Sequence, residues 1–457
     1  MSDEHNDRSR DMLVPFNQRT YRLGIANGVF GYTGSRLADP NTIVPLLIHR
    51  LSGAAWIVGL VLGLKGIVEA VAQVVAARSL DSKDRKKPAY ILGSLTQSLT
   101  YVTVALVMWF ANAIPDTVVL LVFVVALLGY RAGLALSGLT LNDILTKSVP
   151  TTRRGSLHMW RKLGALVVVF FAVTPFVAWI IGPEGPFEFP RNFGILFAAS
   201  VASTGCGWLL FAQAAEPPSR LTGRKLRWSE HLRHGLTLFR GDRCYRRVIR
   251  IRLLVGIAAG VRPFLVVFAT DIWGLSDDVA ATFIAIQVCA EFFGAAVTGA
   301  LSDRRGNRRA ILFMIWSIVL CCAAAVAAAA STWDTTVTLL AWQVNLQIII
   351  LGAAFVGSGL FLASLQIGYN NYLMDISPED QRPSYIGFST AFTVPLAIAP
   401  ILYGWGADVL GYQPAFVSAL VLSLGALYLF LQLPEPRDEL DGCDLEQFRR
   451  PPPAERS

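Results

Sequence analysis

The sequence predicts an all-α membrane protein with twelve transmembrane helices in two pseudo-symmetric six-helix bundles. Hydrophobic residues make up 54% of the 457 residues and charged residues 16%, whereas a soluble domain has roughly 25% charged residues. Apolar segments of about 20 residues, the length that crosses a bilayer as a helix, recur twelve times. These features favour a membrane protein over a soluble one.

The twelve apolar segments follow one another along the chain, and Gly or Pro interrupts several of them. Membrane helices tolerate such residues where neighbouring helices satisfy the backbone. The predicted spans are residues 21–48, 53–77, 88–111, 116–145, 160–182, 192–214, 249–272, 278–300, 310–331, 340–372, 386–408 and 413–433.

A long polar loop after the sixth span divides the chain. In this loop Leu232, Leu236 and Phe239 share one helical face among basic residues, which predicts an amphipathic helix at the membrane surface. The predicted parts are an N-terminal tail (1–20), a first six-helix bundle (21–214), a linker with this interfacial helix (215–248), a second six-helix bundle (249–433) and a C-terminal tail (434–457).

The basic residues predict the orientation, because cytoplasmic loops carry an excess of Lys and Arg. With both termini in the cytoplasm, only Arg50 and Arg191 of the 40 basic residues face outwards, and four lie in the interior of spans. The predicted location is the bacterial inner membrane. This distribution also accounts for the net charge of +8 without a nucleic-acid partner.

The two halves of the chain resemble each other. Gly-Ile-Ala-Asn-Gly-Val at 24–29 recurs as Gly-Ile-Ala-Ala-Gly-Val at 256–261, at the start of the first span of each half. Asn142 and Arg154 match Asn370 and Arg382 with the same spacing. Parallel repeats of six spans are the architecture of many secondary transporters.

One loop carries a family signature. Between the eighth and ninth spans the chain reads Gly299-Ala-Leu-Ser-Asp303-Arg304-Arg305-Gly306-Asn-Arg308-Arg309. This resembles the loop signature of the major facilitator superfamily, and the whole resemblance covers residues 20–433. In the first half Asp81 is retained, but Ser82 and Asp84 replace the expected Arg and Gly.

The resemblance implies the superfamily fold, in a poorly characterised bacterial-type subgroup. It also implies that Asp81 and Asp303 act as conformational gates, together with Gly299, Arg304, Gly306, Arg308 and Arg309 of the complete copy. The alternative for both aspartates is a purely topogenic charge.

Seven charged residues lie in the interior of the predicted spans, away from their first and last turns. A charge in hydrocarbon costs several kcal/mol, so such residues normally face a bundle interior or a water-filled path. We therefore predict that they line a cavity for solute and coupling ion: Arg36, Asp39, Lys65, Glu69, Arg131, Arg262 and Glu291.

Their spacing suggests partners. Arg36 and Asp39 are three residues apart and Lys65 and Glu69 four apart, so each pair shares a helix face. Pro40 and Pro45 remove backbone donors from the first span and predict an interrupted helix. Asp39 and Glu69 are candidate counter-ions for Arg131, and Glu291 is one for Arg262. The alternative is that the local pairs only make charged helices insertable.

These features predict a secondary active transporter that moves a small organic solute by alternating access, coupled to protons through Glu69, Asp39 or Glu291. Four cations against three acids bias the solute towards an anionic group. We expect a monomer in the lipid bilayer.

Other classes lack their motifs. There is no P-loop for an ATP-driven pump, and the dispersed histidines and six scattered cysteines predict no metal site, no cofactor, no disulfide framework and no enzyme. The remaining alternative is a non-transporting homologue that acts as a membrane assembly factor or sensor.

Overall fold

The computed structural model describes residues 16–80, 83–217, 239–331, 336–339, 342–377, 385, 389 and 394–433. The chain divides into two compact units. The first comprises Met1–Gly223 and Val266–Ala285, and the second Arg224–Leu265 and Ile286–Ser457. Each unit is described by itself.

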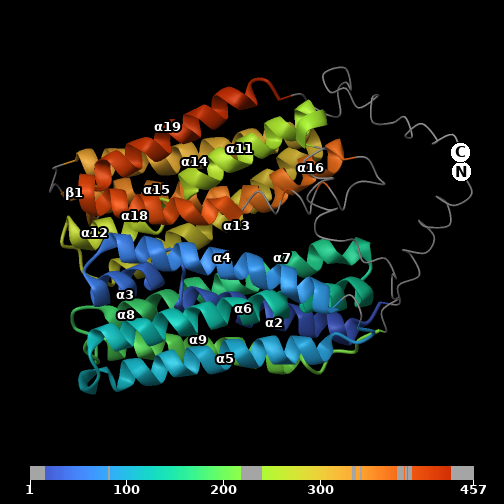
Figure 1. Ribbon diagram of the computed structural model, residues 1–457, viewed down its shortest axis with the longest axis horizontal. Coiled ribbons are helices and arrows are strands. Elements are labelled where there is room, and N and C mark those ends of the chain that lie inside the picture. The colour runs from blue at the N-terminus through green and yellow to red at the C-terminus, as the bar shows by residue number, and fades with distance from the viewer. Residues whose placement is uncertain are drawn as a thin grey trace, which may run out of the picture. The chain divides into compact units, whose positions relative to one another are not determined.

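The first unit is a bundle of long apolar helices (Figure 1). Its members are α2 (Gln18–Leu37), α3 (Ile43–Ser52), α4 (Ala55–Leu80), α5 (Lys87–Trp109), α6 (Asp116–Ser148), α7 (Thr151–Val168), α8 (Thr174–Ile181) and α9 (Arg191–Phe211), with a 3₁₀ turn at Ala111–Ala113 and a π-helical turn at Val169–Val173.

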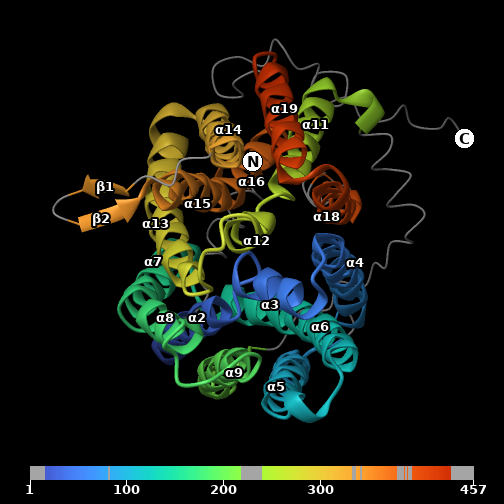
Figure 2. The same ribbon diagram turned by 90° about the vertical axis from the view of Figure 1, so that its left-hand side faces the viewer.

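Helix α9 packs against both α2 and α5, while α6 packs against α5 and α4 (Figure 2). Small residues allow these close approaches: a Cβ atom on Gly93 would lie 2.7 Å from the Gly133 carbonyl oxygen. Such glycine contacts are common between membrane helices. Stacking of Tyr101 on Tyr130, with ring centres 3.9 Å apart, joins α5 to α6 near this crossing.

The first span is interrupted between α2 and α3, as Pro40 predicted. Asp39 organises the break, because its Oδ1 accepts the Asn41 N–H at 2.8 Å and its carbonyl accepts the Val44 N–H at 3.0 Å. Asp39 is completely buried. The carboxylate therefore satisfies a backbone donor that the broken helix would otherwise leave without a partner.

The second unit contains most of the remaining spans (Figure 1). Its elements, two of which continue into the first unit, are α11 (Arg243–Ala259), α12 (Phe264–Asp271), α13 (Val279–Arg305), α14 (Asn307–Ala330), β1 (Thr336–Leu339), β2 (Trp342–Asn345), α15 (Leu346–Ser364), a π-helical turn (Leu365–Tyr369), α16 (Asn370–Ile376), a 3₁₀ turn (Val394–Ala397), α18 (Ile398–Leu410) and α19 (Tyr412–Phe430).

The strands were not predicted. β1 and β2 pair antiparallel, with Thr336 opposite Asn345, in a stretch rich in Thr and Val, which favour strands. The tenth span therefore begins later than the predicted residue 340, because the Asn345 side chain accepts the Gln347 N–H at 2.8 Å and caps α15.

The seventh span also differs from the prediction, both at its start and in its middle. It begins at Arg243, before the predicted residue 249, because Asp242 caps α11 by accepting the Tyr245 N–H at 2.9 Å. It is interrupted before Pro263, and α12 begins only at Phe264. Cys244 forms a disulfide bond, although the scattered cysteines predicted none.

Within the described residues, ten helical segments are long and apolar enough to cross a membrane, and shorter apolar helices lie at Ile43–Ser52 and Val394–Leu410. These account for the twelve predicted spans and confirm the all-α membrane class, apart from the two short strands. Leu232 and Leu236 of the predicted interfacial helix lie outside the described residues, as do most residues of both tails.

Candidate functional site

The break in the first span carries an ion pair. Arg36 Nη1 lies 2.8 Å from Asp39 Oδ2, and the two side chains are 14% and 1% exposed. The last turn of α2 places the Arg36 guanidinium beside Asp39, two residues beyond the end of the helix at Leu37, as the spacing of three predicted. Because Asp39 also holds the turn, this pair has a structural role.

A second ion pair joins α4 to α6. Arg131 Nη1 lies 3.6 Å from Glu69 Oε2, and the two side chains are 13% and 34% exposed. Glu69 was one of the two counter-ions expected for Arg131. The structure brings Glu69 to Arg131, because α6 packs against α4 along this face.

Arg262 lies at the interruption of the seventh span. Its Nε donates to the Ala259 carbonyl at 3.0 Å, its Nη1 donates to Ser358 Oγ at 3.5 Å, and its guanidinium lies 5.5 Å from the ring centre of Phe361. Glu291, its predicted counter-ion, is partly buried on α13. Both interrupted helices therefore hold an arginine at the break.

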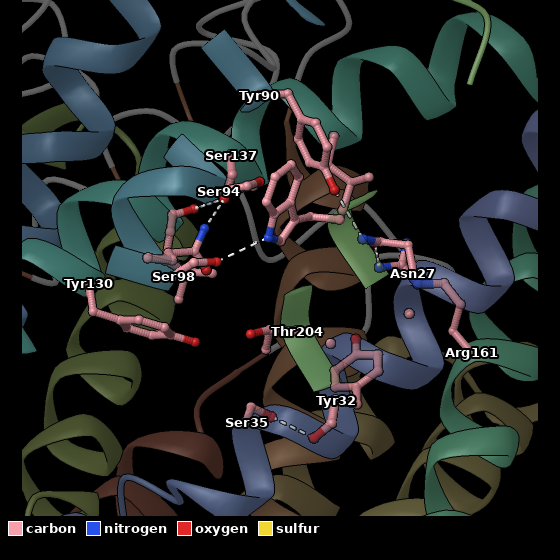
Figure 3. A pocket seen from close by; sticks show the side chains of 17 residues that line it. Asn27, Tyr32, Ser35, Tyr90, Ser94, Ser98, Tyr130, Ser137, Arg161 and Thr204 are labelled. Atoms are coloured by element: carbon pink, nitrogen blue, oxygen red, sulfur yellow. Dashed lines mark hydrogen bonds between the residues drawn. The ribbon is translucent and has the colours of Figure 1, made fainter. Parts of the chain in front are cut away.

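A polar cavity of about 320 Å³ lies inside the first unit (Figure 3). Helices α2, α5, α6, α7 and α9 line it with hydroxyl, amide, indole and guanidinium groups. The polar lining residues are Asn27, Tyr32, Ser35, Tyr90, Ser94, Gln97, Ser98, Tyr130, Ser137, Arg161, Thr204 and Trp208.

Hydrogen bonds between helices hold several of these side chains in place. Asn27 Nδ2 donates to Tyr90 Oη at 3.0 Å, and Gln97 Nε2 donates to Ser137 Oγ at 2.7 Å. Ser98 Oγ accepts a hydrogen bond from the indole N–H of Trp208, as Figure 3 shows. A cavity fixed in this way presents a preformed polar surface to a ligand.

Arg161 is the one charged residue of the lining. It is 8% exposed, and its Nη2 lies 3.5 Å from Asn27 Oδ1. Its Nε finds no hydrogen-bond acceptor, and no described carboxylate lies within ion-pair distance. Arg161 therefore differs from Arg36 and Arg131, which each have an acidic partner.

Neither Arg161 nor the cavity was predicted from the sequence. Arg161 lies at the inner end of the predicted fifth span and was grouped with the cytoplasmic charges. The predicted spans 88–111 and 192–214 contain no charged residue, yet their helices α5 and α9 supply uncharged polar groups to the cavity. The available signal was the helical spacing of Tyr90, Ser94 and Gln97, which places them on one face. None of the seven predicted cavity residues lines this cavity.

The signature loop ends α13 and begins α14. Gly306 has φ +85°, a backbone conformation that residues with a side chain rarely adopt. Beyond it, Asn307 Nδ2 donates to Asp375 Oδ2 at 2.6 Å, and Ser302 donates to Asn307. Asn371 also donates to Ser302, at 3.3 Å. This network ties both helix ends to α16, and Asn307 and Asp375 were not predicted.

The other signature positions differ in their surroundings. Asp303, Arg304 and Arg309 are exposed at the helix ends. The Arg308 guanidinium lies 5.0 Å from the ring centre of Phe430. A Cβ atom on Gly299 would meet nothing within 4 Å, so packing inside the described unit does not require glycine there.

The first half has a charged counterpart to this network. Lys86 Nζ lies 2.8 Å from Asp143 Oδ1, and Lys147 also pairs with Asp143. Glu216 accepts the backbone N–H groups of Lys86 and Lys87. The end of α6 is thereby joined to the start of α5. Asp81, the predicted gate of this half, lies outside the described residues.

Comparison with known proteins supports the fold. The family model of the Major Facilitator Superfamily matches residues 257–453, and the comparison with curated sequences gives no match. The structure of the nucleoside transporter NupG is similar, with a TM-score of 0.65 and 13% identity, over 90% of this chain and 99% of that chain.

Two further structures show the same likeness. A D-xylose–proton symporter has a TM-score of 0.64 and 13% identity, over 92% of this chain and 98% of its own. A bacterial homologue of the iron transporter ferroportin, in an inward-facing state, has a TM-score of 0.63 and 12% identity, over 91% and 98%. At these identities the likeness concerns the fold alone, and it confirms the predicted fold.

Proposed function

We propose that this chain is a member of the major facilitator superfamily and a secondary active transporter that moves a small organic solute by alternating access. The observation that carries the proposal is the polar cavity inside a bundle of membrane-crossing helices. Polar and charged groups are costly at membrane depth and are normally kept there for a solute or ion path.

The lining favours an organic solute. Phenol, hydroxyl, amide and indole groups suit a hydroxylated organic molecule, whereas metal ions prefer clusters of carboxylate, imidazole or thiolate ligands. One of the similar structures belongs to a homologue of an iron transporter, and two others belong to transporters of a nucleoside and of D-xylose. We therefore propose organic solutes of sugar or nucleoside size.

We further propose coupling to protons, through Glu69, Asp39 or Glu291. Glu69 and Asp39 each face an arginine inside the membrane region. Protonation of such a carboxylate would release its ion pair and shift the balance between inward-open and outward-open states. The arginine opposes protonation, so proton uptake would be tied to a movement that separates the pair.

The test is gradient-driven uptake into proteoliposomes for a panel of labelled sugars, nucleosides and organic acids. For a transported solute, changing the coupling carboxylate to its amide should reduce pH-driven uptake at least about tenfold, because a single proton site is lost, while counterflow without a gradient persists. Asp116→Asn, at an exposed helix start, is the control.

Full pH-driven uptake in the Glu69, Asp39 and Glu291 variants, singly and together, would contradict proton coupling. No flux of any solute would favour the assembly-factor or sensor alternative.

Asp303→Asn is expected to slow conformational cycling more than solute binding. Asp303 is at the exposed end of α13, outside the polar cavity, and the superfamily signature implies a gating role for it. The maximal transport rate should fall about tenfold with the solute Kd changed less than twofold, since only a transition-related contact is lost. Asp116→Asn, at an exposed helix start outside the signature, should leave both unchanged. Lost binding with normal cycling would refute the gate.

We also propose a monomer in the bacterial inner membrane with both termini cytoplasmic. The support is the distribution of Lys and Arg in the sequence, which follows the positive-inside rule. Single cysteines placed in the 215–248 linker should be labelled by membrane-impermeant reagents only after the membrane is opened. Labelling in intact cells would reverse the orientation.

A further inference from the structure

We infer that the polar cavity of the first unit binds a small organic anion and that Arg161 holds its carboxylate or phosphate group. This inference rests on the proposed transport function and specifies the substrate class of that function. It assigns a role to a residue outside the seven charged positions that the sequence indicated.

The charge of Arg161 is the first argument. A buried ion normally has an opposite charge beside it, because desolvation is otherwise costly. Arg161 is 8% exposed and lines the cavity, and among the described residues no carboxylate is within ion-pair distance of it. A ligand anion would supply the missing charge.

The geometry of the guanidinium is the second argument. Arginine presents a planar set of donors that matches carboxylate and phosphate oxygens. Here one donor makes only a long contact of 3.5 Å, to Asn27 Oδ1, and Nε has no acceptor at all. Figure 3 shows Arg161 beside Asn27 at the cavity. The long contact at Nη2 therefore leaves the end of the guanidinium for a ligand, whereas Nε is enclosed against Gly28.

The rest of the lining indicates the remainder of the ligand. Tyr32, Tyr90 and Tyr130 offer phenol groups from three helices, and Ser35 and Thr204 add hydroxyls. These groups both donate and accept hydrogen bonds, which suits a hydroxylated carbon skeleton. A volume of about 320 Å³ is at the small end of ligand pockets. The class is thus a sugar acid, a hydroxycarboxylate or a small phosphate ester.

The test measures binding to full-length protein in nanodiscs of neutral lipid, with gluconate, inorganic phosphate and glucose as probes. Gluconate or phosphate should bind and raise the thermal transition, whereas uncharged glucose should bind at least tenfold more weakly. Comparing the binding of gluconate with that of phosphate shows whether the site takes a carboxylate or a phosphate group. Arg161→Gln should weaken the binding of the anion about 30-fold or more, which is the usual effect of losing one partner of a buried charge pair.

Arg153→Gln is the matched control, because it removes a cation from an exposed position of the same helix and should leave binding unchanged. Without ligand, Arg161→Gln should be at least as stable as the parent, since it removes a buried charge without an acidic partner. A large loss of stability would indicate a structural arginine and overturn the inference, as would anion binding that does not depend on Arg161.

Two further outcomes are distinguishable. If anionic phosphatidylglycerol in the nanodisc, and not the soluble anions, stabilises the protein through Arg161, the site belongs to a lipid head group and the inference is wrong. If the soluble anions bind through Arg161 but no solute flux is found in proteoliposomes, the transport function fails while the anion site stands. Flux of an anion that is unaffected by Arg161→Gln would refute the site alone.

Discussion

Replacing Asp39 by alanine is expected to destabilise the protein by about 4 kcal/mol, the typical effect of removing one partner of a buried ion pair. The Asp39 side chain is 1% exposed and lies 2.8 Å from Arg36. The same carboxylate accepts the Asn41 N–H at 2.8 Å. The variant therefore loses both the charge that neutralises an arginine in the membrane and the acceptor that holds the break between α2 and α3.

Asp39→Asn separates these two contributions. The asparagine side chain keeps an acceptor for the Asn41 N–H, so about 1 kcal/mol of the loss should be recovered, while the lost charge remains. Equilibrium unfolding in mixed micelles measures both variants. Glu184→Ala, at an exposed loop position, should change stability by less than about 0.5 kcal/mol. Equal stability of Asp39→Ala and the parent would show that the pair does not hold the interrupted span.

The sequence predicted the spans well because hydrophobic length is a direct consequence of bilayer thickness. The ends of the spans were harder to predict, since they depend on single capping contacts. Asn345 and Asp242 moved two helix starts by accepting one backbone N–H each. The strands at Thr336–Leu339 and Trp342–Asn345 fell in an apolar run whose periodicity does not separate a strand from a buried helix.

The candidate site was predictable where partners are close in sequence. The pairing of Arg36 with Asp39 follows from a separation of three residues, whereas the partner of Glu69 depended on which face of α6 meets α4. Arg161 was hidden by the span boundary. The fifth span was predicted from residue 160, but α7 begins at Thr151, so Arg161 lies about 15 Å along the helix at 1.5 Å per residue.

Gly28→Ala is expected to weaken anion binding about tenfold or more, and by a larger factor than Gly31→Ala. Both glycines lie on α2 and line the polar cavity. A Cβ atom on Gly28 would lie 2.1 Å from Arg161 Nε and 2.6 Å from Arg161 Cβ, whereas one on Gly31 would meet nothing within 4 Å. The new methyl group at position 28 must displace the guanidinium, and a shift of about 1 Å in a binding group can cost a hundredfold.

The free energy of unfolding provides a second readout that separates the two glycine variants. Alanine is favoured over glycine in a helix by about 1 kcal/mol, so Gly31→Ala should be slightly more stable than the parent. Gly28→Ala gains the same preference but loses about 1 to 3 kcal/mol through overpacking against Arg161, so it should be less stable than Gly31→Ala. Combining Gly28→Ala with Arg161→Ala should relieve part of this strain, because alanine lacks the Cγ and Nε atoms that the methyl group meets. Binding that survives in Gly28→Ala but is lost in Gly31→Ala would place the ligand further along α2 and away from Arg161.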